Sequence, residues 1–234
     1  MAFLFTLLFA LAFAGTTPSG TAFPAPVVLT TADGVTLQAS IGAPAKAEKG
    51  VVFVHMAGRS KEDWAPIAEK LYRQGLMVLT IDLRGHGANV TGTPVPLTEA
   101  EWAHTTEDVK AGVAELRRRG AKKVALIGAE VGANLSLIVA SEDVAIASVS
   151  MLSPGLDYKG LLTSEPAKRY GSRPLYLVSS ADDPYGTRCA AQINTLAGGG
   201  ATLQAFETAG KGTKMFAREP TLESLLMGFV NSHW

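Results

Sequence analysis

Short apolar runs that alternate with helical segments constrain the fold of this chain more than any other feature. Three of these runs, 51–54, 77–81 and 124–127, are almost entirely apolar. Such continuous runs are typical of strands buried on both faces, which occur in parallel sheets covered by helices. Further strands are predicted at 144–151, 174–179 and 202–207, and helices at 62–74, 98–120, 131–140, 185–196 and 219–231. The sequence therefore predicts an α/β fold with a mostly parallel sheet and helices on both faces.

The predicted sheet begins with an antiparallel hairpin. Residues 27–31 and 35–41 alternate around an Asp-Gly turn at 33–34, which is a strong hairpin signal. Later in the chain, only a short segment separates the strand that ends near Leu152 from the strand that starts at Pro174. We therefore expect no large lid domain over the carboxyl ends of the strands.

Polar residues mark the beginnings of two predicted helices. Ser60 is placed to cap the helix 62–74, because a serine hydroxyl accepts a hydrogen bond from a free amide of the first turn. Thr98 and Glu101 have the spacing of a capping box, which predicts the start of the long helix that follows.

The first residues of the chain have the composition of a secretory signal. An apolar run at 2–14 ends in an A-x-A pattern, and it is too short to span a membrane. We expect cleavage near Ala14 and export, with no membrane span in the mature protein. Because no Lys or Arg precedes the run, an uncleaved N-terminal anchor is the alternative. The predicted organisation is a signal peptide at 1–14, a spacer at 15–25 and a single domain at 26–234.

Charge and cysteine content exclude several classes of function. The chain has 21 basic and 21 acidic residues and a formal net charge of +0, so it lacks the basic surplus of a nucleic-acid-binding domain. Cys189 is the single cysteine, and the four histidines show no metal-ligand spacing. We therefore predict no disulfide, no metal site and no cofactor, and a small-molecule ligand as the expected partner.

Gly128-Ala129-Glu130-Val131-Gly132 connects a predicted buried strand to a predicted helix. That context is typical of a nucleophile elbow, G-x-S-x-G, in which the central residue projects above the sheet in a strained conformation. The two glycines are needed because strand and helix come very close there. Here the central residue is Glu130 instead of serine.

Six segments in this order and spacing resemble small bacterial α/β-hydrolases of the dienelactone-hydrolase-like or serine-aminopeptidase-like kind. They are VHMAGRS at 54–60, DLRGHG at 82–87, GAEVG at 128–132, LSPGLDY at 152–158, SADDPY at 180–185 and GKGT at 210–213. The resemblance extends from about residue 27 onward and implies the α/β-hydrolase fold.

The resemblance also implies roles for individual residues. The catalytic acid of that family corresponds best to Asp183, with Asp182 as the alternative. The catalytic histidine corresponds to Lys211, and backbone oxyanion donors correspond to Val131 and to Met56 or Ala57. The acid is thus retained, whereas the nucleophile and the base are both replaced.

These replacements argue against serine chemistry. Serine attack needs a hydroxyl and a neutral base, whereas Glu130 offers a weakly nucleophilic carboxylate and Lys211 an ammonium. Two opposite charges at positions expected to touch compensate each other, so we predict an ion triad of Glu130, Lys211 and Asp183. No histidine is expected to act as a substitute base, and no other serine lies in an elbow.

The function predicted is that of a pseudoenzyme, a catalytically impaired serine-hydrolase homologue that binds a small molecule or a partner in the former active-site pocket. The alternative is an esterase-like or dehalogenase-like hydrolase that uses Glu130 in place of serine.

Overall fold

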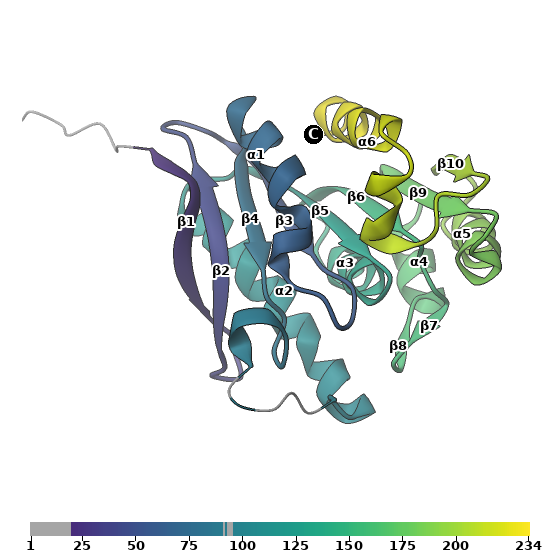
Figure 1. The fold of residues 1–234 in the computed structure, drawn as a ribbon, viewed down its shortest axis with the longest axis horizontal. Helices are drawn as coiled ribbons and strands as arrows, with labels where there is room; N and C mark the ends of the chain where they lie inside the picture. The colour runs from purple at the N-terminus through teal and green to yellow at the C-terminus, as the bar shows by residue number, and fades with distance from the viewer. Residues whose placement is uncertain (1–19, 91, 93–95) are drawn as a thin grey trace, which may run out of the picture.

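The computed structural model describes residues 20–90, 92 and 96–234, and its central feature is one eight-stranded sheet (Figure 1). The strands are β1 (Thr21–Thr30), β2 (Thr36–Ala43), β3 (Lys49–Val54), β4 (Met77–Ile81), β5 (Lys123–Ala129), β6 (Ile146–Leu152), β9 (Leu175–Ser180) and β10 (Thr202–Phe206). They are arranged in the order β1-β2-β4-β3-β5-β6-β9-β10. The six strands from β4 to β10 run parallel, and β2 pairs antiparallel with both β1 and β4.

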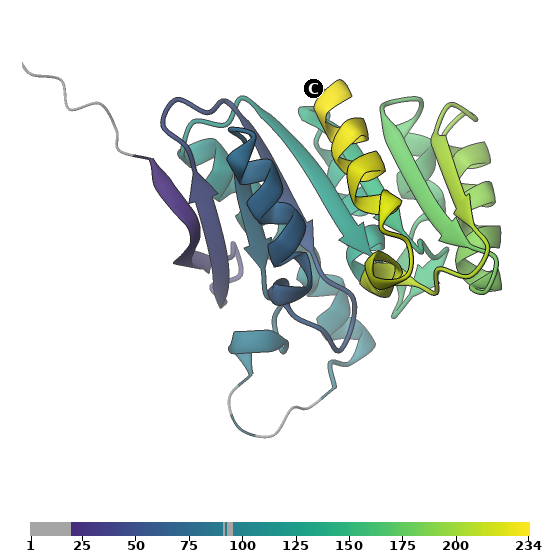
Figure 2. The ribbon, with the colours of Figure 1, turned by 45° about the horizontal axis from the view of Figure 1, so that its top comes forward.

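Helices cover both faces of this sheet (Figure 2). The α-helices are α1 (Ala65–Arg73), α2 (Glu99–Arg118), α3 (Val131–Glu142), α4 (Ser164–Tyr170), α5 (Pro184–Leu196) and α6 (Thr221–Ser232). Three 3-10 helices are η1 (Lys61–Trp64), η2 (Gly87–Asn89) and η3 (Gly212–Ala217). Buried side chains of α1 and α6 pack in one apolar cluster, and those of α2 to α5 pack in a second cluster. The predicted α/β architecture is confirmed.

The N-terminal hairpin is also confirmed, but it begins earlier than expected. Gly34 takes the left-handed conformation that the turn requires, with a φ of 83°. Thr21 pairs with Ala43, so β1 includes residues that the sequence assigned to the spacer 15–25. The two prolines in this stretch are compatible with a strand because β1 lies at the edge of the sheet, where one side needs no donors.

The predicted signal peptide at 1–14 lies outside the described residues. In the part of the chain that the structure describes, no helix is both long and apolar enough to cross a membrane.

The structure contains one of the two predicted side-chain helix caps but not the other. Thr98 and Glu101 form the predicted capping box: the Glu101 amide donates to Thr98 Oγ1 at 3.3 Å, and the Thr98 amide donates to Glu101 Oε2 at 2.7 Å. Ser60 occupies the cap position of η1, but its side chain makes no capping hydrogen bond. The helix expected at 62–74 begins with this 3-10 turn and becomes α-helical only at Ala65.

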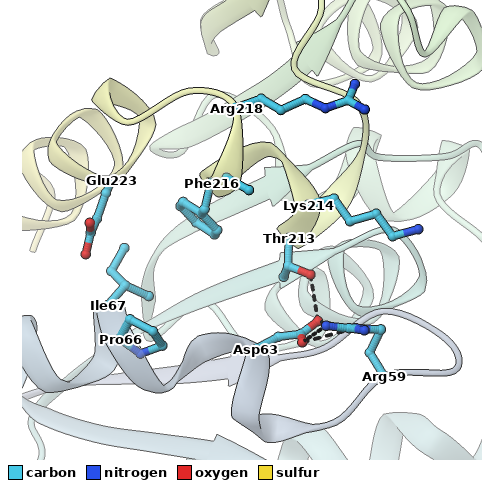
Figure 3. Close-up of a pocket in the computed structure, with 10 residues that line it drawn as sticks. Arg59, Asp63, Pro66, Ile67, Thr213, Lys214, Phe216, Arg218 and Glu223 are labelled. Atoms are coloured by element: carbon cyan, nitrogen blue, oxygen red, sulfur yellow. Dashed lines mark hydrogen bonds and ion pairs between the residues drawn. The ribbon is translucent and has the colours of Figure 1, made fainter.

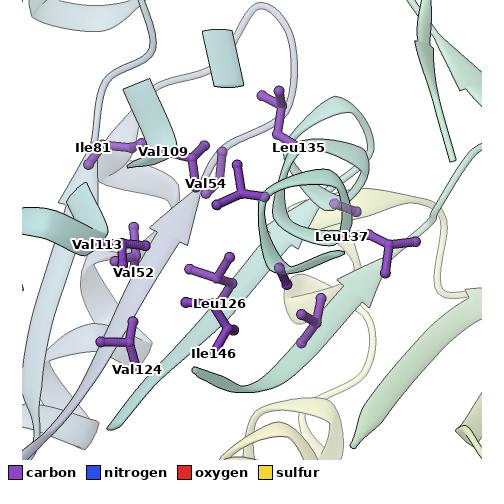
Figure 4. Close-up of a cluster of buried hydrophobic side chains, with 14 of the residues drawn as sticks. Val52, Val54, Ile81, Val109, Val113, Val124, Leu126, Leu135, Leu137 and Ile146 are labelled. Carbon is purple, nitrogen blue, oxygen red and sulfur yellow. The ribbon is translucent and has the colours of Figure 1, made fainter. Parts of the chain in front are cut away.

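Apolar side chains hold α2 and α3 against the centre of the sheet (Figure 4). Val52 and Val54 of β3 and Leu126 of β5 are fully buried there. Each contributes about 1.5–3 kcal/mol by removal from water. Gly112 lets α2 approach the sheet, because a Cβ at that position lies only 3.1 Å from Cγ1 of Val52. This packing fixes the positions of the loops at the carboxyl ends of β3 and β5.

The segment between β6 and β9 contains no large lid. It forms a small two-stranded sheet, β7 (Asp157–Tyr158) with β8 (Leu161–Leu162), followed by α4. None of these three elements is predicted by the sequence, because each is too short to show a periodic pattern.

Candidate functional site

The turn between β5 and α3 has the strained geometry of a nucleophile elbow. Glu130 adopts φ 48° and ψ −114°, a conformation that costs a non-glycine residue about 1–3 kcal/mol. A Cβ at Gly128 would clash with the backbone of Gly132, and a Cβ at Gly132 would clash with the backbone of Val54. Both glycines are therefore required by the close approach of strand and helix, as the sequence predicts.

The side chain at the centre of this elbow pairs with the lysine from the opposite loop. Glu130 Oε1 lies 3.1 Å from Nζ of Lys211, which precedes η3. The Glu130 side chain is 11% exposed and that of Lys211 is 48% exposed. The contact is an ion pair without the alignment of a hydrogen bond, since Glu130 Oε1 has no hydrogen-bond partner. The predicted contact between the two replaced positions is thus present.

The third member of the predicted ion triad does not join the pair. Asp183 is buried at the N-terminus of α5, where it accepts a hydrogen bond from the Gly186 amide at 3.2 Å. Its other oxygen, Oδ2, is buried and has no hydrogen-bond partner. In the described residues, Lys211 makes no ion pair with an aspartate. Lysine is longer than histidine and its ammonium lies at the end of a half-exposed chain, so it contacts Glu130 alone.

Asp182, the alternative acid, turns away from the elbow. It accepts hydrogen bonds from the Ser180 hydroxyl and from the Gly210 amide at 2.9 Å. The Ser180 hydroxyl and this amide lower the pKa of Asp182, and Arg218 adds a contact at 3.4 Å. Asp182 thus anchors the loop before Lys211. The assignment of Asp183 as the equivalent of the catalytic acid stays a prediction.

Ser153 holds the same loop from the other side. It follows β6 with a φ of 50° and is fully buried, and its Oγ accepts a hydrogen bond from the Gly212 amide at 2.9 Å. Gly212 in turn leaves room for Met56, since a Cβ there would lie only 2.6 Å from Met56 Sδ. Ser153 is therefore a positioning residue for the segment that carries Lys211, a role that the sequence does not reveal.

Tyr158 is a second residue of this region that the sequence analysis missed. Burial raises the pKa of its phenol, and the negative charges of Glu130 and Asp183 raise that pKa further. The hydroxyl faces the carbonyl oxygen of Ser153 at 3.4 Å. A neutral tyrosine thus lies near both carboxylates. Tyr158 belongs to the segment 152–158 that carries the resemblance, but its proximity to Glu130 and Asp183 arises only in the folded chain.

The predicted oxyanion donors lie around the elbow. The amide of Val131 is in the first turn of α3 and has no intrahelical acceptor. Met56 and Ala57 follow β3, and the Met56 carbonyl accepts a hydrogen bond from the Arg59 amide at 3.2 Å. Their role as donors stays a prediction.

No histidine takes over the missing base position in the described part of the chain. His55 is buried between two loops: Nδ1 faces the Met56 carbonyl at 2.8 Å and Nε2 accepts from the Leu83 amide at 3.0 Å. Burial lowers the pKa of His55 to about 4. His86 packs against His55 with its Nδ1 near the Arg84 carbonyl. Both rings support loop structure, as the sequence analysis expects.

A cavity of about 470 Å³ opens beside this region, between α1 and the segment η3–α6 (Figure 3). Glu130 and Lys211 do not line it. Met56 and Thr213 lie between the cavity and the elbow, with Thr213 Oγ1 3.5 Å from Met56 Sδ. Among the described residues, no cluster of three or more His, Cys, Asp or Glu side chains is arranged to hold a metal ion.

Comparisons with known proteins agree with this geometry. An esterase from Pyrococcus furiosus superposes with a TM-score of 0.74 at 19% identity, over 89% of this chain and 92% of that one. A dienelactone hydrolase from Anabaena variabilis gives 0.70 at 19% identity, over 93% of this chain and 99% of that one. At this identity the likeness shows the α/β-hydrolase fold alone. No curated protein sequence matches the chain.

Residues 45–179, more than half of the chain, match the family described as serine aminopeptidase, S33. The matched region runs from the start of β3 to β9 and includes the elbow with Glu130 at its centre. The chain therefore belongs to the serine aminopeptidase S33 family of the α/β-hydrolase fold.

Proposed function

We propose that this protein is a non-hydrolytic member of its family that binds a small molecule or a partner at the former active site. The observation that carries the proposal is the elbow itself, where a strained Glu130 pairs with Lys211 at 3.1 Å. The chain has the strained backbone of a nucleophile elbow but no serine at its centre. This combination supports a role in binding.

The chemistry of the pair supports this reading. Glu130 is a weak nucleophile toward esters, and the Lys211 ammonium is engaged in an ion pair with that carboxylate. No imidazole of the described residues contacts Glu130, so a covalent intermediate there lacks a group to activate water.

One observation favours the alternative, a hydrolase that uses Glu130 covalently. The elbow presents Glu130 in the conformation in which a serine nucleophile would be presented. Attack on an alkyl carbon would leave an ester on Glu130. Intact-protein mass spectrometry after incubation with an alkyl halide distinguishes this route, because a stable mass increase at Glu130 supports it.

Restoring the lost residues tests the proposal. We expect the double variant Glu130→Ser/Lys211→His to hydrolyse short-chain aryl esters at least about 100-fold faster than the wild type, since it regains a hydroxyl and a neutral base. The single variant Glu130→Ser is the matched control and should remain slow. If the wild type already hydrolyses these esters as fast as the double variant, the proposal is wrong.

A further inference from the structure

The cavity between α1 and η3 differs in character between its two ends. In Figure 3 Lys214 and Arg59 lie on the right and Arg218 lies above them, whereas Ile67 and Glu223 lie on the left. We propose that this cavity binds a small amphipathic carboxylate, an anion with an apolar tail. This cavity is lined by neither Glu130 nor Lys211, so the inference goes beyond the proposed function.

The apolar end is built from rigid parts of the fold. Ile67 of α1 is 3% exposed, and Phe216 of η3 packs edge-on against the buried ring of Trp64, with ring centroids 5.8 Å apart. Pro66 and Ala217 complete this lining. A volume of about 470 Å³ lies within the usual range of small-molecule sites, and such a lining favours a hydrocarbon tail.

The charged end has a surplus of cations. Arg59 is already paired with Asp63, which also accepts a hydrogen bond from the Thr213 hydroxyl at 2.6 Å. Arg218 makes only long contacts, of 3.4 Å each, with the Asp182 carboxylate and with the carbonyl oxygen of Thr208. Lys214 is exposed and makes no ion pair with any described residue. Lys214 and Arg218 therefore have capacity to bind an anionic head group.

The opposite end disfavours a second anion. Glu223 lies there, and its Oε2 pairs with Lys70 at 2.7 Å. Its other oxygen, Oε1, is buried and accepts no hydrogen bond. A ligand with a carboxylate at both ends would bring a negative charge beside this oxygen. The cavity thus selects a monocarboxylate over a dicarboxylate of the same length.

The cavity also lies one residue layer from the former active site. Thr213 and Lys214 line it, and both belong to the segment that begins with Lys211. A Cβ at Gly212 would meet Met56 Sδ at 2.6 Å and Glu130 Oε1 at 3.6 Å, so this residue lies beside both side chains. A ligand in the cavity would therefore lie against the segment that carries half of the Glu130–Lys211 pair.

Isothermal titration of the purified protein with octanoate and three probes of similar length tests the ligand class. We expect octanoate to bind one to one and about fivefold more tightly than octanamide, the increment of one partly exposed charge pair. Octylamine and octanedioate should bind more weakly than octanoate. Absence of octanoate binding at millimolar concentrations, or equal binding of the amide or the dicarboxylate, overturns the inference.

Three variants locate the site. Lys214→Gln should weaken octanoate binding about fivefold and leave octanamide binding unchanged. Lys123→Gln is the matched control, because Lys123 is also exposed but lies at the start of β5, at the opposite end of the parallel strands. Ala217→Phe should fill the cavity and abolish binding of both ligands. Lys214 and Ala217 are both exposed, so these variants should fold, and thermal unfolding verifies this.

The outcomes separate the two proposals. Equal effects of Lys214→Gln and Lys123→Gln, or full octanoate binding by Ala217→Phe, overturn the cavity inference. Rapid ester hydrolysis by the wild type overturns the proposed function instead and leaves the measured binding intact.

Discussion

At the scale of single residues, Glu130 combines a strained backbone with an ion pair that is open to solvent on one side. A φ of 48° is costly for glutamate but not for glycine. The partner Lys211 is 48% exposed, so the pair contributes little to stability in return. The residue at the elbow therefore weakens the fold.

We predict that Glu130→Gly raises the free energy of unfolding by about 1 kcal/mol. The substitution relieves the backbone strain at position 130 and removes only the weak ion pair with Lys211. Urea unfolding of both proteins measures the difference. Gly132→Ala serves as the control in the opposite direction, since its Cβ would clash with the backbone of Val54. A clear loss of stability in Glu130→Gly would mean that the ion pair contributes more than its exposure implies.

At the scale of elements, two polar side chains join segments that are distant in the sequence. His55 links the loop after β3 to the loop after β4, and Arg84 links α2 to the N-terminal hairpin.

The His55 contact predicts a dependence of stability on pH. Burial lowers the pKa of His55 to about 4, below its ordinary value of about 6.5, so the unfolded chain binds the proton more readily. The contribution of neutral His55 to the free energy of unfolding is therefore fully present above about pH 6.5. It is lost as the pH falls toward 4, and the loss amounts to up to about 3 kcal/mol. His55→Gln, which keeps a donor and an acceptor, should lack this slope.

Unfolding free energies measured at several pH values between 4 and 7 provide the readout. His104→Gln is the matched control, because His104 is exposed. This variant should show the same dependence of unfolding free energy on pH as the wild type. Identical slopes for His55→Gln and the wild type would show that His55 is not the titrating group.

The Arg84 contact predicts a large loss of stability on truncation. Arg84 donates to the fully buried Asp108 carboxylate at 2.6 and 2.8 Å and pairs with Asp33 at 2.7 Å. Arg84→Ala leaves Asp108 buried without its counter-ion and should cost about 3 kcal/mol or more in urea unfolding. Arg118→Ala removes an exposed pair with Glu115 and should cost less than about 0.5 kcal/mol. Similar costs for both variants would contradict this account.

At the scale of the whole molecule, the features that follow from local sequence pattern can be predicted from the sequence. The order of strands and helices follows from apolar periodicity, and the elbow follows from Gly128 and Gly132, whose need for close approach is visible in their spacing. The small β7–β8 sheet and α4 are too short for a pattern, and β1 extends into a stretch with two prolines.

The remainder of the site depends on segments that meet only in the folded chain. Ser153 and Tyr158 come from the segment after β6 whereas Gly212 begins η3, and the cavity joins residues of α1 to residues of η3 and α6. The predicted ion triad is reduced to the Glu130–Lys211 pair, because the reach of a lysine and the anchoring of Asp183 to α5 are properties of the tertiary structure.

We propose that replacement of the serine by Glu130 leaves this chain without serine-hydrolase chemistry. Treatment of the purified wild-type protein with a fluorophosphonate probe, followed by intact-mass analysis, tests it most directly, with the Glu130→Ser/Lys211→His variant as the positive control. We predict no mass increase in the wild type and one adduct in the variant. An adduct on any serine of the wild type, Ser153 included, would contradict the claim.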